Sequence, residues 1–278
     1  MRGAMVGLLV SSLAFCGCAS LFPSLFSPAV AGVEAFQFEA SRVPVGIVYH
    51  YVKSNIDGST PERISLYMSD QTTLEAYRWR EPTPQTTFHV KATMDWDRLS
   101  AVRLESWRKV RFGGEQLNAV AEYSALTRVM SIEFSDKTRH TVAIDDLPFH
   151  FYQFDLASLN VAFRLLRDPK APFRVGLVNP TFAMTGAALE YRGLATVTYE
   201  KDETHNEFPC RRYRIDGPGL KNKGGSIWVD KSEGHIIDLE IQLENHPDWT
   251  SFKLKFVGKE TMDAAAWQAF MKSRFDAT

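Results

Sequence analysis

Histidines and cysteines are the side chains best suited to chemistry in this chain, since they can bind metals, transfer protons or attack a carbonyl group. The seven histidines are His50, His89, His140, His150, His205, His235 and His246. None forms a His-x-His or His-x-x-x-His pair, so the compact spacing of a zinc site is absent from the sequence. The sequence also lacks a nucleophile elbow, a phosphate loop and a dinucleotide-binding motif. We therefore predict a protein that is not an enzyme and holds no metal or cofactor, unless folding brings His50, His89 or His140 beside acids.

Two further groups of reactive or charged residues are interpreted as structural. Cys210 is predicted to be a buried core residue, the usual role of a free thiol with no base nearby in sequence. Arg211, Arg212 and Arg214 flank Tyr213, a mixture that also occurs in nucleic-acid binders. Alternating arginines on a strand more often form the wet face of a sheet. The formal net charge of −1 also provides no broad basic surface, so we predict no nucleic-acid partner.

The N-terminal residues carry the pattern of an export signal. The segment 4–15 has no charge and suits the apolar region of a signal peptide, whereas it is too short to cross a membrane. The run Phe15-Cys16-Gly17-Cys18-Ala19 is similar to a bacterial lipobox, in which Cys18 would be the acylated anchor. The alternative is cleavage after Ala31, in the run Ala29-Val30-Ala31, which would release a soluble protein. We predict an exported protein, either anchored to the outer membrane through Cys18 or free in the periplasm.

The body of the chain has the two-residue period of β-strands. In residues 45–52, Val45, Ile47, Tyr49 and Tyr51 alternate with the other side chains, and a turn follows at residues 55–58. Similar alternation recurs between residues 63 and 134 and again between residues 194 and 257. Charged residues interleave regularly with apolar ones, as in an antiparallel sheet with one wet face.

Two helices are expected to interrupt or cover this sheet. Asp155 is a candidate N-cap for a helix that ends near Arg167, before a loop-rich stretch that reaches Gly193. A second helix is expected at the C-terminus, with Trp267, Phe270 and Met271 on one face. The predicted fold is mainly β (α+β): a large curved antiparallel sheet or half-barrel with a central helix and a C-terminal helix. We expect a leader at 1–18, a tether at 19–42 and a single β-rich domain at 43–278.

Large aromatic side chains are frequent on the segments that could reach the concave side of such a sheet. They are Trp79, Trp107, Phe149, Phe151, Phe154, Phe163 and Trp228. One interpretation is an ordinary core closed by the central helix. The other is an apolar groove open enough for an acyl chain, because apolar pockets are the common form of small-ligand site. Both interpretations stay open at the level of sequence.

One hairpin resembles a known family. The run 226–239, Ser-Ile-Trp-Val-Asp-Lys-Ser-Glu-Gly-His-Ile-Ile-Asp-Leu, is similar to the late hairpin of the LolA/LolB-like envelope superfamily. The resemblance covers residues 44–258 in architecture, and the chain departs from it by its length and by an aromatic insertion near 145–193. It implies an unclosed barrel that cradles lipid or lipoprotein acyl chains. A non-enzymatic carrier of an apolar ligand is therefore expected, with a lipid or a lipidated protein as partner; the alternative is a scaffolding lipoprotein that binds a protein partner.

Overall fold

The structure is a computed structural model that describes residues 30–82, 85–180 and 189–276, and it contains fifteen strands within those ranges. The first eight are β1 (Ile47–Ser54), β2 (Glu62–Met68), β3 (Thr73–Trp79), β4 (Thr86–Asp95), β5 (Ser100–Val110), β6 (Gly114–Ser124), β7 (Val129–Phe134) and β8 (Arg139–Ala143). The others are β9 (Phe149–Phe151), β10 (Phe173–Pro180), β11 (Leu189–His205), β12 (Phe208–Asp216), β13 (Gly225–Asp230), β14 (Ile236–Ile241) and β15 (Phe252–Thr261). The helices are α1 (Ala157–Ala162) and α2 (Ala264–Asp276), with short 3₁₀ turns η1 (Val33–Ala35), η2 (Ala40–Arg42), η3 (Phe163–Leu165) and η4 (Pro218–Leu220).

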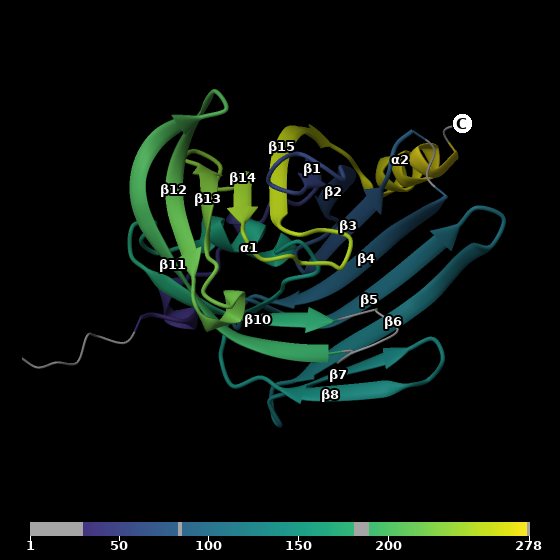
Figure 1. The fold of residues 1–278 in the computed structure, drawn as a ribbon, viewed down its shortest axis with the longest axis horizontal. Coiled ribbons are helices and arrows are strands. Elements are labelled where there is room, and N and C mark those ends of the chain that lie inside the picture. The colour runs from purple at the N-terminus through teal and green to yellow at the C-terminus, as the bar shows by residue number, and fades with distance from the viewer. Residues whose placement is uncertain (1–29, 83–84, 181–188, 277–278) are drawn as a thin grey trace, which may run out of the picture.

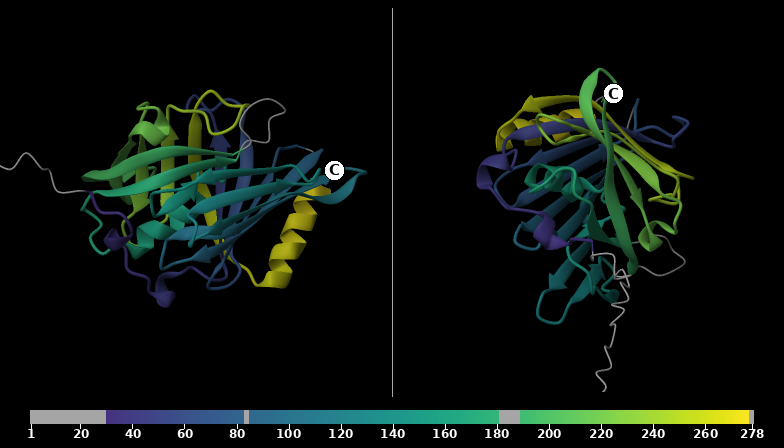
Figure 2. Two further views of the ribbon diagram at one scale, coloured as in Figure 1. Left: turned by 90° about the horizontal axis from the view of Figure 1, so that it is seen from below. Right: turned by 90° about the vertical axis from the view of Figure 1, so that its left-hand side faces the viewer.

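All fifteen strands form one sheet, which confirms the predicted curved antiparallel fold. Its order is β8-β7-β6-β5-β4-β3-β2-β1-β15-β14-β13-β12-β11-β10-β9, so two meanders meet where β1 pairs with β15. The sheet curls until its ends approach other strands: β8 lies beside β11, and the backbone N–H of Phe149 in β9 donates to Ser100 Oγ in β5 at 2.9 Å. α1 lies inside this curve (Figure 1), and an end-on view shows the sheet wrapped around it (Figure 2).

Strand alternation gives the sheet its two faces. In β4, Val90, Ala92 and Met94 are buried in the main core, while the intervening Lys91 and Thr93 are exposed. Successive side chains of a strand point to opposite faces, so this pattern places the apolar set on the concave side. The same face of β1 carries Tyr49 and Tyr51. The concave side therefore forms the main core of the protein.

The central helix is shorter than the sequence predicts and begins differently. α1 covers Ala157–Ala162 and continues only as the 3₁₀ turn η3. The N-cap is Leu156, in a left-handed conformation and without a side-chain cap bond, rather than Asp155. The cap prediction is wrong because the Asp155 carboxylate pairs with Lys53 of β1 at 2.8 Å instead of binding the helix backbone.

The region between the helix and Gly193 is more ordered than the sequence predicts. Residues 173–180 form β10, which pairs with β11 in an antiparallel register. On its other side β10 pairs in parallel with the short strand β9, the one parallel pair among the fifteen described strands. The run Phe173-Arg-Val-Gly-Leu-Val178 is almost continuously apolar, and such runs do not show the alternation by which half-buried strands are recognised.

The C-terminal helix matches the prediction and covers the opposite, convex face. The backbone N–H of Ala266 donates to Asp263 Oδ1 at 2.8 Å, so Asp263 caps α2. Trp267, Phe270 and Met271 are its buried residues, and they pack on Tyr67 and other residues of β1–β3. Figure 2 shows α2 crossing the outside of the sheet.

Residues before β1 also contact the body of the protein. Phe36 is buried in the main core, and it forms an isolated bridge with Leu166. The backbone N–H of Arg167 donates to the Ala35 carbonyl at 3.0 Å. The described part of the predicted tether thus packs beside the end of η3. The leader, Cys18 and the first residue of the alternative cleavage run, Ala29, lie outside the described residues.

Candidate functional site

The concave face is apolar and filled. The segment 152–166, which we call the central segment, lies in it with almost every side chain buried. Between this segment and the inner faces of β1–β3, the remaining void is about 10 Å³, lined in part by Leu66, Met68 and Val161. A void of this size holds at most about one water molecule, so no acyl chain fits there in this conformation.

The seven predicted groove residues fall into two sets. Phe149, Phe151, Phe154 and Phe163 lie together in the concave core. Trp79 and Trp228 lie on the convex side, in separate clusters with α2 and with Cys210. Trp107 stands opposite His89 in the β4–β5 ladder, and His89 binds a carboxylate that also contacts α2. Directly paired residues share a face, so Trp107 is on the convex side as well.

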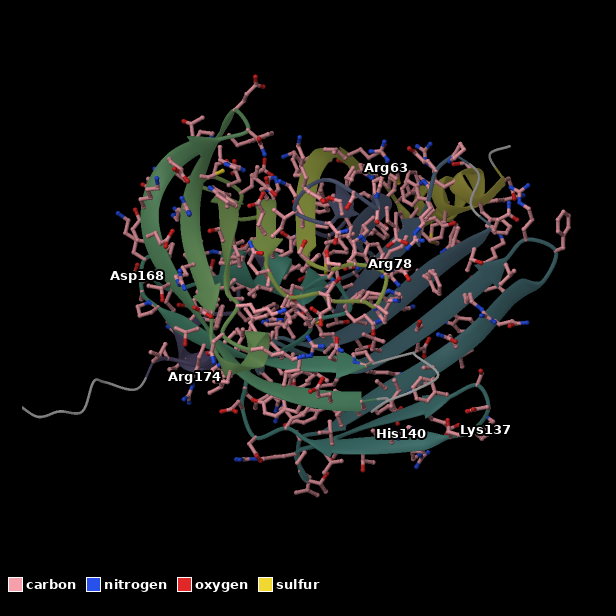
Figure 3. All side chains as sticks on the ribbon, in the orientation of Figure 1. Arg63, Arg78, Lys137, His140, Asp168 and Arg174 are labelled. Carbon is pink, nitrogen blue, oxygen red and sulfur yellow. The ribbon has the colours of Figure 1, made fainter. Side chains whose placement is uncertain are left out.

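An ion pair holds the start of the central segment. Lys53 and Asp155 are buried, with side chains 0% and 1% exposed, and Lys53 Nζ lies 2.8 Å from Asp155 Oδ1. Lys53 Nζ also lies 4.2 Å from the centre of the Trp249 ring. Burial lowers the pKa of Lys53, and the carboxylate of Asp155 acts in the opposite direction. Arg78 of β3, labelled in Figure 3, also approaches this ion pair: its Nη1 lies 3.9 Å from Asp155 Oδ2.

Polar bonds also hold the middle and the end of the central segment. Asn160 Nδ2 donates to the Tyr51 hydroxyl at 3.0 Å, and Asn160 Oδ1 accepts from the Ile236 backbone N–H at 2.7 Å. Arg164 Nη2 donates to the Tyr49 hydroxyl at 2.5 Å. These few directed bonds fix the position of a short helix that would be unstable alone.

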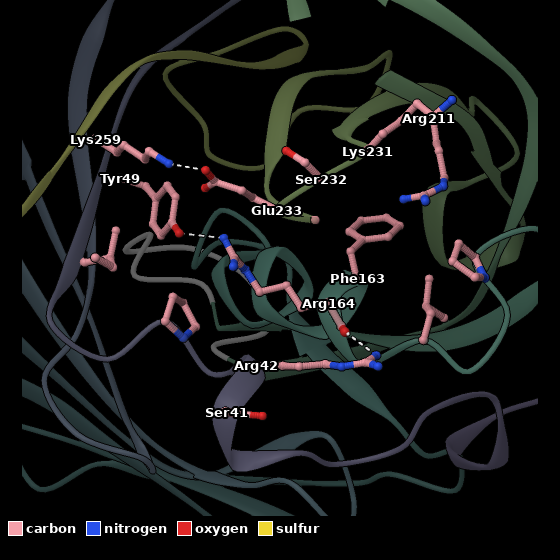
Figure 4. Close-up of a pocket in the computed structure, with 15 residues that line it drawn as sticks. Ser41, Arg42, Tyr49, Phe163, Arg164, Arg211, Lys231, Ser232, Glu233 and Lys259 are labelled. Atoms are coloured by element: carbon pink, nitrogen blue, oxygen red, sulfur yellow. Dashed lines mark hydrogen bonds and ion pairs between the residues drawn. The ribbon is translucent and has the colours of Figure 1, made fainter. Parts of the chain in front are cut away.

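A cleft opens where the central segment ends. It has a volume of about 500 Å³ and is bordered by η2, the first residues of β1, residues 163–169 and the β13–β14 turn. Its cationic side chains, which define what we call the basic cleft, are Arg42, Arg164, Arg211, Lys231 and Lys259. Glu233 is the single carboxylate in the lining, and Phe163, Ile47 and Leu166 provide apolar surface. Figure 4 shows these side chains arranged around Phe163.

The local backbone explains how the β13–β14 turn reaches this cleft. Asp230 accepts hydrogen bonds from the backbone N–H groups of Ser232 and Glu233, at 2.9 and 2.7 Å, which folds the turn tightly. Gly234 has a φ of +70°, and a Cβ placed on it would lie 3.0 Å from Arg164 Cγ and 3.2 Å from Arg164 Cα. Glycine therefore allows the turn to contact the backbone of η3 directly.

A buried histidine lies behind the cleft. His235 is 3% exposed, its ring centroid is 5.1 Å from that of Tyr49, and neither ring nitrogen has a hydrogen-bond partner in the described residues. Nδ1 lies 3.7 Å from Glu233 Oε2. Burial, with Arg164 acting in the same direction, lowers the pKa of His235 to about 4. The folded protein therefore holds this ring neutral at neutral pH.

Replacing His235 by phenylalanine is expected to weaken the acid sensitivity of the fold. The folded pKa is below the value of about 6.5 in the unfolded chain, so the unfolded state takes up the proton first as the pH falls. This histidine then lowers the free energy of unfolding by about 1.4 kcal/mol per pH unit between about pH 6 and 4. Urea unfolding at pH 7, 5.5 and 4.5 measures the slope. Equal slopes for the wild-type protein and H235F would contradict the assignment.

Of the three histidines that the sequence analysis singled out, His50 and His89 lie beside acids, as an enzyme would require. His50 Nδ1 is 2.7 Å from Ser65 Oγ and its Nε2 is 2.8 Å from Glu260 Oε1, while His89 Nε2 is 2.8 Å from Glu75 Oε2. The first set has the connectivity of a Ser-His-Glu triad. However, Ser65 is 0% exposed and the His50 ring packs 5.5 Å from Phe270 of α2, so a substrate carbonyl has no access to the hydroxyl. The bonds join β1, β2 and β15 beneath α2. Figure 3 shows His140 far from this place, at the β7–β8 hairpin.

Other candidate groups are accounted for by packing. Cys210 is fully buried beside Trp228, and burial raises the pKa of its thiol to about 11. No group of three or more metal-binding side chains occurs in the described ranges. In the same ranges, no helix has the length and apolarity needed to cross a bilayer.

The basic cleft was not predicted from sequence, and one part of the earlier interpretation is wrong. Arg212 and Arg214 lie on the convex face, as expected of a wet surface, and bind Glu200 and Asp216. Along β12, Arg211 points to the same face of the sheet as Tyr213 and Ile215, which are core residues, so it lies on the concave side. The place of Arg211 in this alternation was the one feature of the local sequence that could have indicated the basic cleft. The other four cations come from distant segments that only the fold brings together.

No family model and no curated protein matches the sequence. Among solved structures, the chain is similar to one named as an outer membrane lipoprotein-sorting protein domain from Vibrio parahaemolyticus, with 10% identity and a TM-score of 0.32 over 88% of this chain and 97% of that one. It is also similar to a DUF1329 family protein from Desulfovibrio piger, with 8% identity and a TM-score of 0.28 over 83% of this chain and 91% of that one. The chain thus has a distant structural similarity to a lipoprotein-sorting domain, and we interpret its site from its own residues.

Proposed function

We propose that this chain is a non-enzymatic protein of the bacterial cell envelope that binds an apolar ligand, a lipid or the acyl chain of a lipoprotein, in the concave face of its sheet. The observation that carries the proposal is the composition of that face: apolar side chains from both meanders converge on the central segment, whose helix α1 is only six residues long. The export signal predicted from the first residues agrees with an envelope location.

Binding requires the central segment to move. Small-ligand sites usually have volumes of about 300–1,000 Å³, far more than the void of about 10 Å³ beside Val161. The basic cleft offers about 500 Å³ at the end of the same segment, next to Phe163. An acyl chain entering from the cleft would take the place of buried side chains of the central segment, exchanging one apolar contact for another.

A substitution of Asn160 tests whether the central segment must be displaced before a ligand binds. Its side chain holds the closed position through Tyr51 and the Ile236 backbone, and each such bond contributes about 0.5–1.5 kcal/mol. Replacing Asn160 by alanine is expected to raise the affinity for cis-parinaric acid by about tenfold, because the closed state that competes with the ligand is weakened. Fluorescence titration measures the affinity, and hydrogen exchange of residues 157–165 should accelerate when the probe binds.

A matched control is Gln116→Ala, at an exposed position near the start of β6, which should leave the affinity unchanged. Mass spectrometry of protein purified without detergent adds an independent measurement, since a carrier should retain lipid. If no lipid co-purifies and neither the wild-type protein nor N160A binds the probe, the proposal fails.

A scaffolding role is the second candidate, and the filled concave face favours it. In that case the ligand site is absent and a protein partner contacts the sheet edge or the insertion near 145–193. The strand β8 is at one end of the strand order and carries exposed residues at four of its five positions, and such edges are where added strands pair. A partner captured by the wild-type chain and lost when β8 carries a proline at Thr141, together with no probe binding, would favour this role.

A further inference from the structure

We propose that the basic cleft binds the phosphate group of an anionic amphiphile whose chain runs along Phe163 toward the concave face. This inference rests on the proposed function and specifies the ligand class of the same site. The chain as a whole has a formal net charge of −1, yet five cationic side chains and one carboxylate line this one cleft. The concentration of positive charge is therefore local.

The pairing of these cations shows which of them are available. Arg42 binds Glu39 at 2.8 Å, Lys231 binds Asp202 at 2.7 Å, and Lys259 binds Glu233. Carboxylates of the protein therefore balance the positive charges of these three side chains. Ion pairs at such half-exposed positions remain exchangeable, since they contribute only about 0–1 kcal/mol each.

Arg164 and Arg211 differ from the other three. Neither has a carboxylate within ion-pair distance in the part of the chain that the structure describes. Asp202 stands opposite Arg211 in the β11–β12 ladder, but its carboxylate is bound to Lys231. Arg164 donates only to the neutral hydroxyl of Tyr49. Two guanidinium groups therefore line one cleft without an ion pair to any described carboxylate.

The chemistry of guanidinium favours a phosphate over a lone carboxylate at this place. A phosphate has several acceptor oxygens, so it can accept from one arginine in the paired geometry that guanidinium forms best and still accept from a second cation of the cleft. Figure 4 shows Arg164 directed toward Tyr49 and Arg211 extending from the opposite side of the cleft toward Phe163. The ring of Phe163 lies between them, where the chain attached to a phosphate would begin. Arg164 also belongs to the central segment, so binding there acts directly on the element that must move.

Three probes separate the sources of the anion. They are dodecyl phosphate, inorganic phosphate and the neutral dodecyl maltoside, and their binding to the full chain is measured by isothermal titration calorimetry below the micelle concentration. We expect dodecyl phosphate to bind at least tenfold more tightly than either of the others. Its affinity should also fall as salt rises from 50 to 300 mM, because the contacts are ionic. Equal affinity for inorganic phosphate and dodecyl phosphate would overturn the amphiphile and leave a free-anion site.

Matched arginine variants locate the interaction. Arg211→Gln is expected to weaken dodecyl phosphate binding about tenfold and Arg164→Gln/Arg211→Gln about a hundredfold, with dodecyl maltoside unaffected to within twofold. Arg214→Gln, on the same strand but the convex face, should bind as the wild-type protein does. Arg211→Gln alone keeps the test valid if the double variant unfolds, since Arg211 forms no ion pair with a residue that the structure describes. Binding of both dodecyl ligands with equal affinity, or unchanged binding in R211Q, would overturn this inference while leaving the apolar site standing. If the wild-type protein binds none of the three probes, both this inference and the proposed function are overturned.

Discussion

Replacing Asp155 by asparagine should lower the free energy of unfolding by about 3–5 kcal/mol, the usual cost of removing one partner from a buried ion pair. The substitution leaves Lys53, which is 0% exposed, without its counter-charge in a site where burial already lowers its pKa. Arg78, 3.9 Å from the same carboxylate, loses a partner too. Asp155 has a φ of +55°, which asparagine tolerates, so backbone strain does not contribute. Urea unfolding at pH 7 measures the change.

A second substitution separates the charge effect from a loss of packing. The double variant Lys53→Met/Asp155→Asn removes the unpaired buried cation and should recover at least half of the lost stability. The reason is that the apolar methionine suits the surroundings of Trp249 and Phe252. Arg139→Gln provides the surface comparison: its ion pair with Glu133 is exposed, and its removal should cost less than about 1 kcal/mol. A loss in the double variant as large as in D155N would show that the charges are not the cause.

The sheet could be predicted because its strands are half-buried. In β4, Val90, Ala92 and Met94 alternate with Lys91 and Thr93. This alternation follows directly from a sheet that has one solvent-exposed and one buried face. The same reasoning located α2, whose Trp267, Phe270 and Met271 recur at helical spacing. It missed β10, which is buried on both faces and so lacks alternation, and it misplaced the start of α1. The Asp155 carboxylate had an available partner on a distant strand, and this interaction decided its role over the local capping bond.

The site was less predictable because it depends on contacts between segments far apart in the sequence. Aromatic residues were assigned to one groove by type, yet the direction of a side chain depends on strand parity and on bulges. Trp107 is one example: it pairs with His89 across the β4–β5 ladder and so lies on the face opposite to the core residue Leu104. Trp79 and Trp228 have convex parity and pack under α2 and beside Cys210 instead. The five cations of the basic cleft belong to five segments. The sequence indicated one of them, Arg211, through its place in the alternation of β12.

Removing the indole of Trp267 should be the most damaging change on the convex face. Trp267 is 1% exposed, packs 5.0 Å from the Tyr67 ring and 5.5 Å from the Phe270 ring, and is the largest buried side chain of α2. Trp267→Ala is expected to cost about 3–5 kcal/mol, measured by urea unfolding, because the cavity it leaves lies between a helix and a rigid sheet.

Hydrogen bonding adds to this cost, and a smaller substitution separates it from packing. Trp267 Nε1 donates to Glu75 Oε2 at 2.8 Å, and His89 lies 2.8 Å from the same oxygen. Burial acts to raise the pKa of Glu75, but these bonds outweigh it and the pKa is lowered. Trp267→Phe keeps most of the ring and loses the N–H, so it should cost about 1–3 kcal/mol. Leu126→Ala, at a side chain 95% exposed, should change stability by less than about 0.5 kcal/mol. If W267A is no worse than L126A, the packing of α2 does not stabilise the sheet.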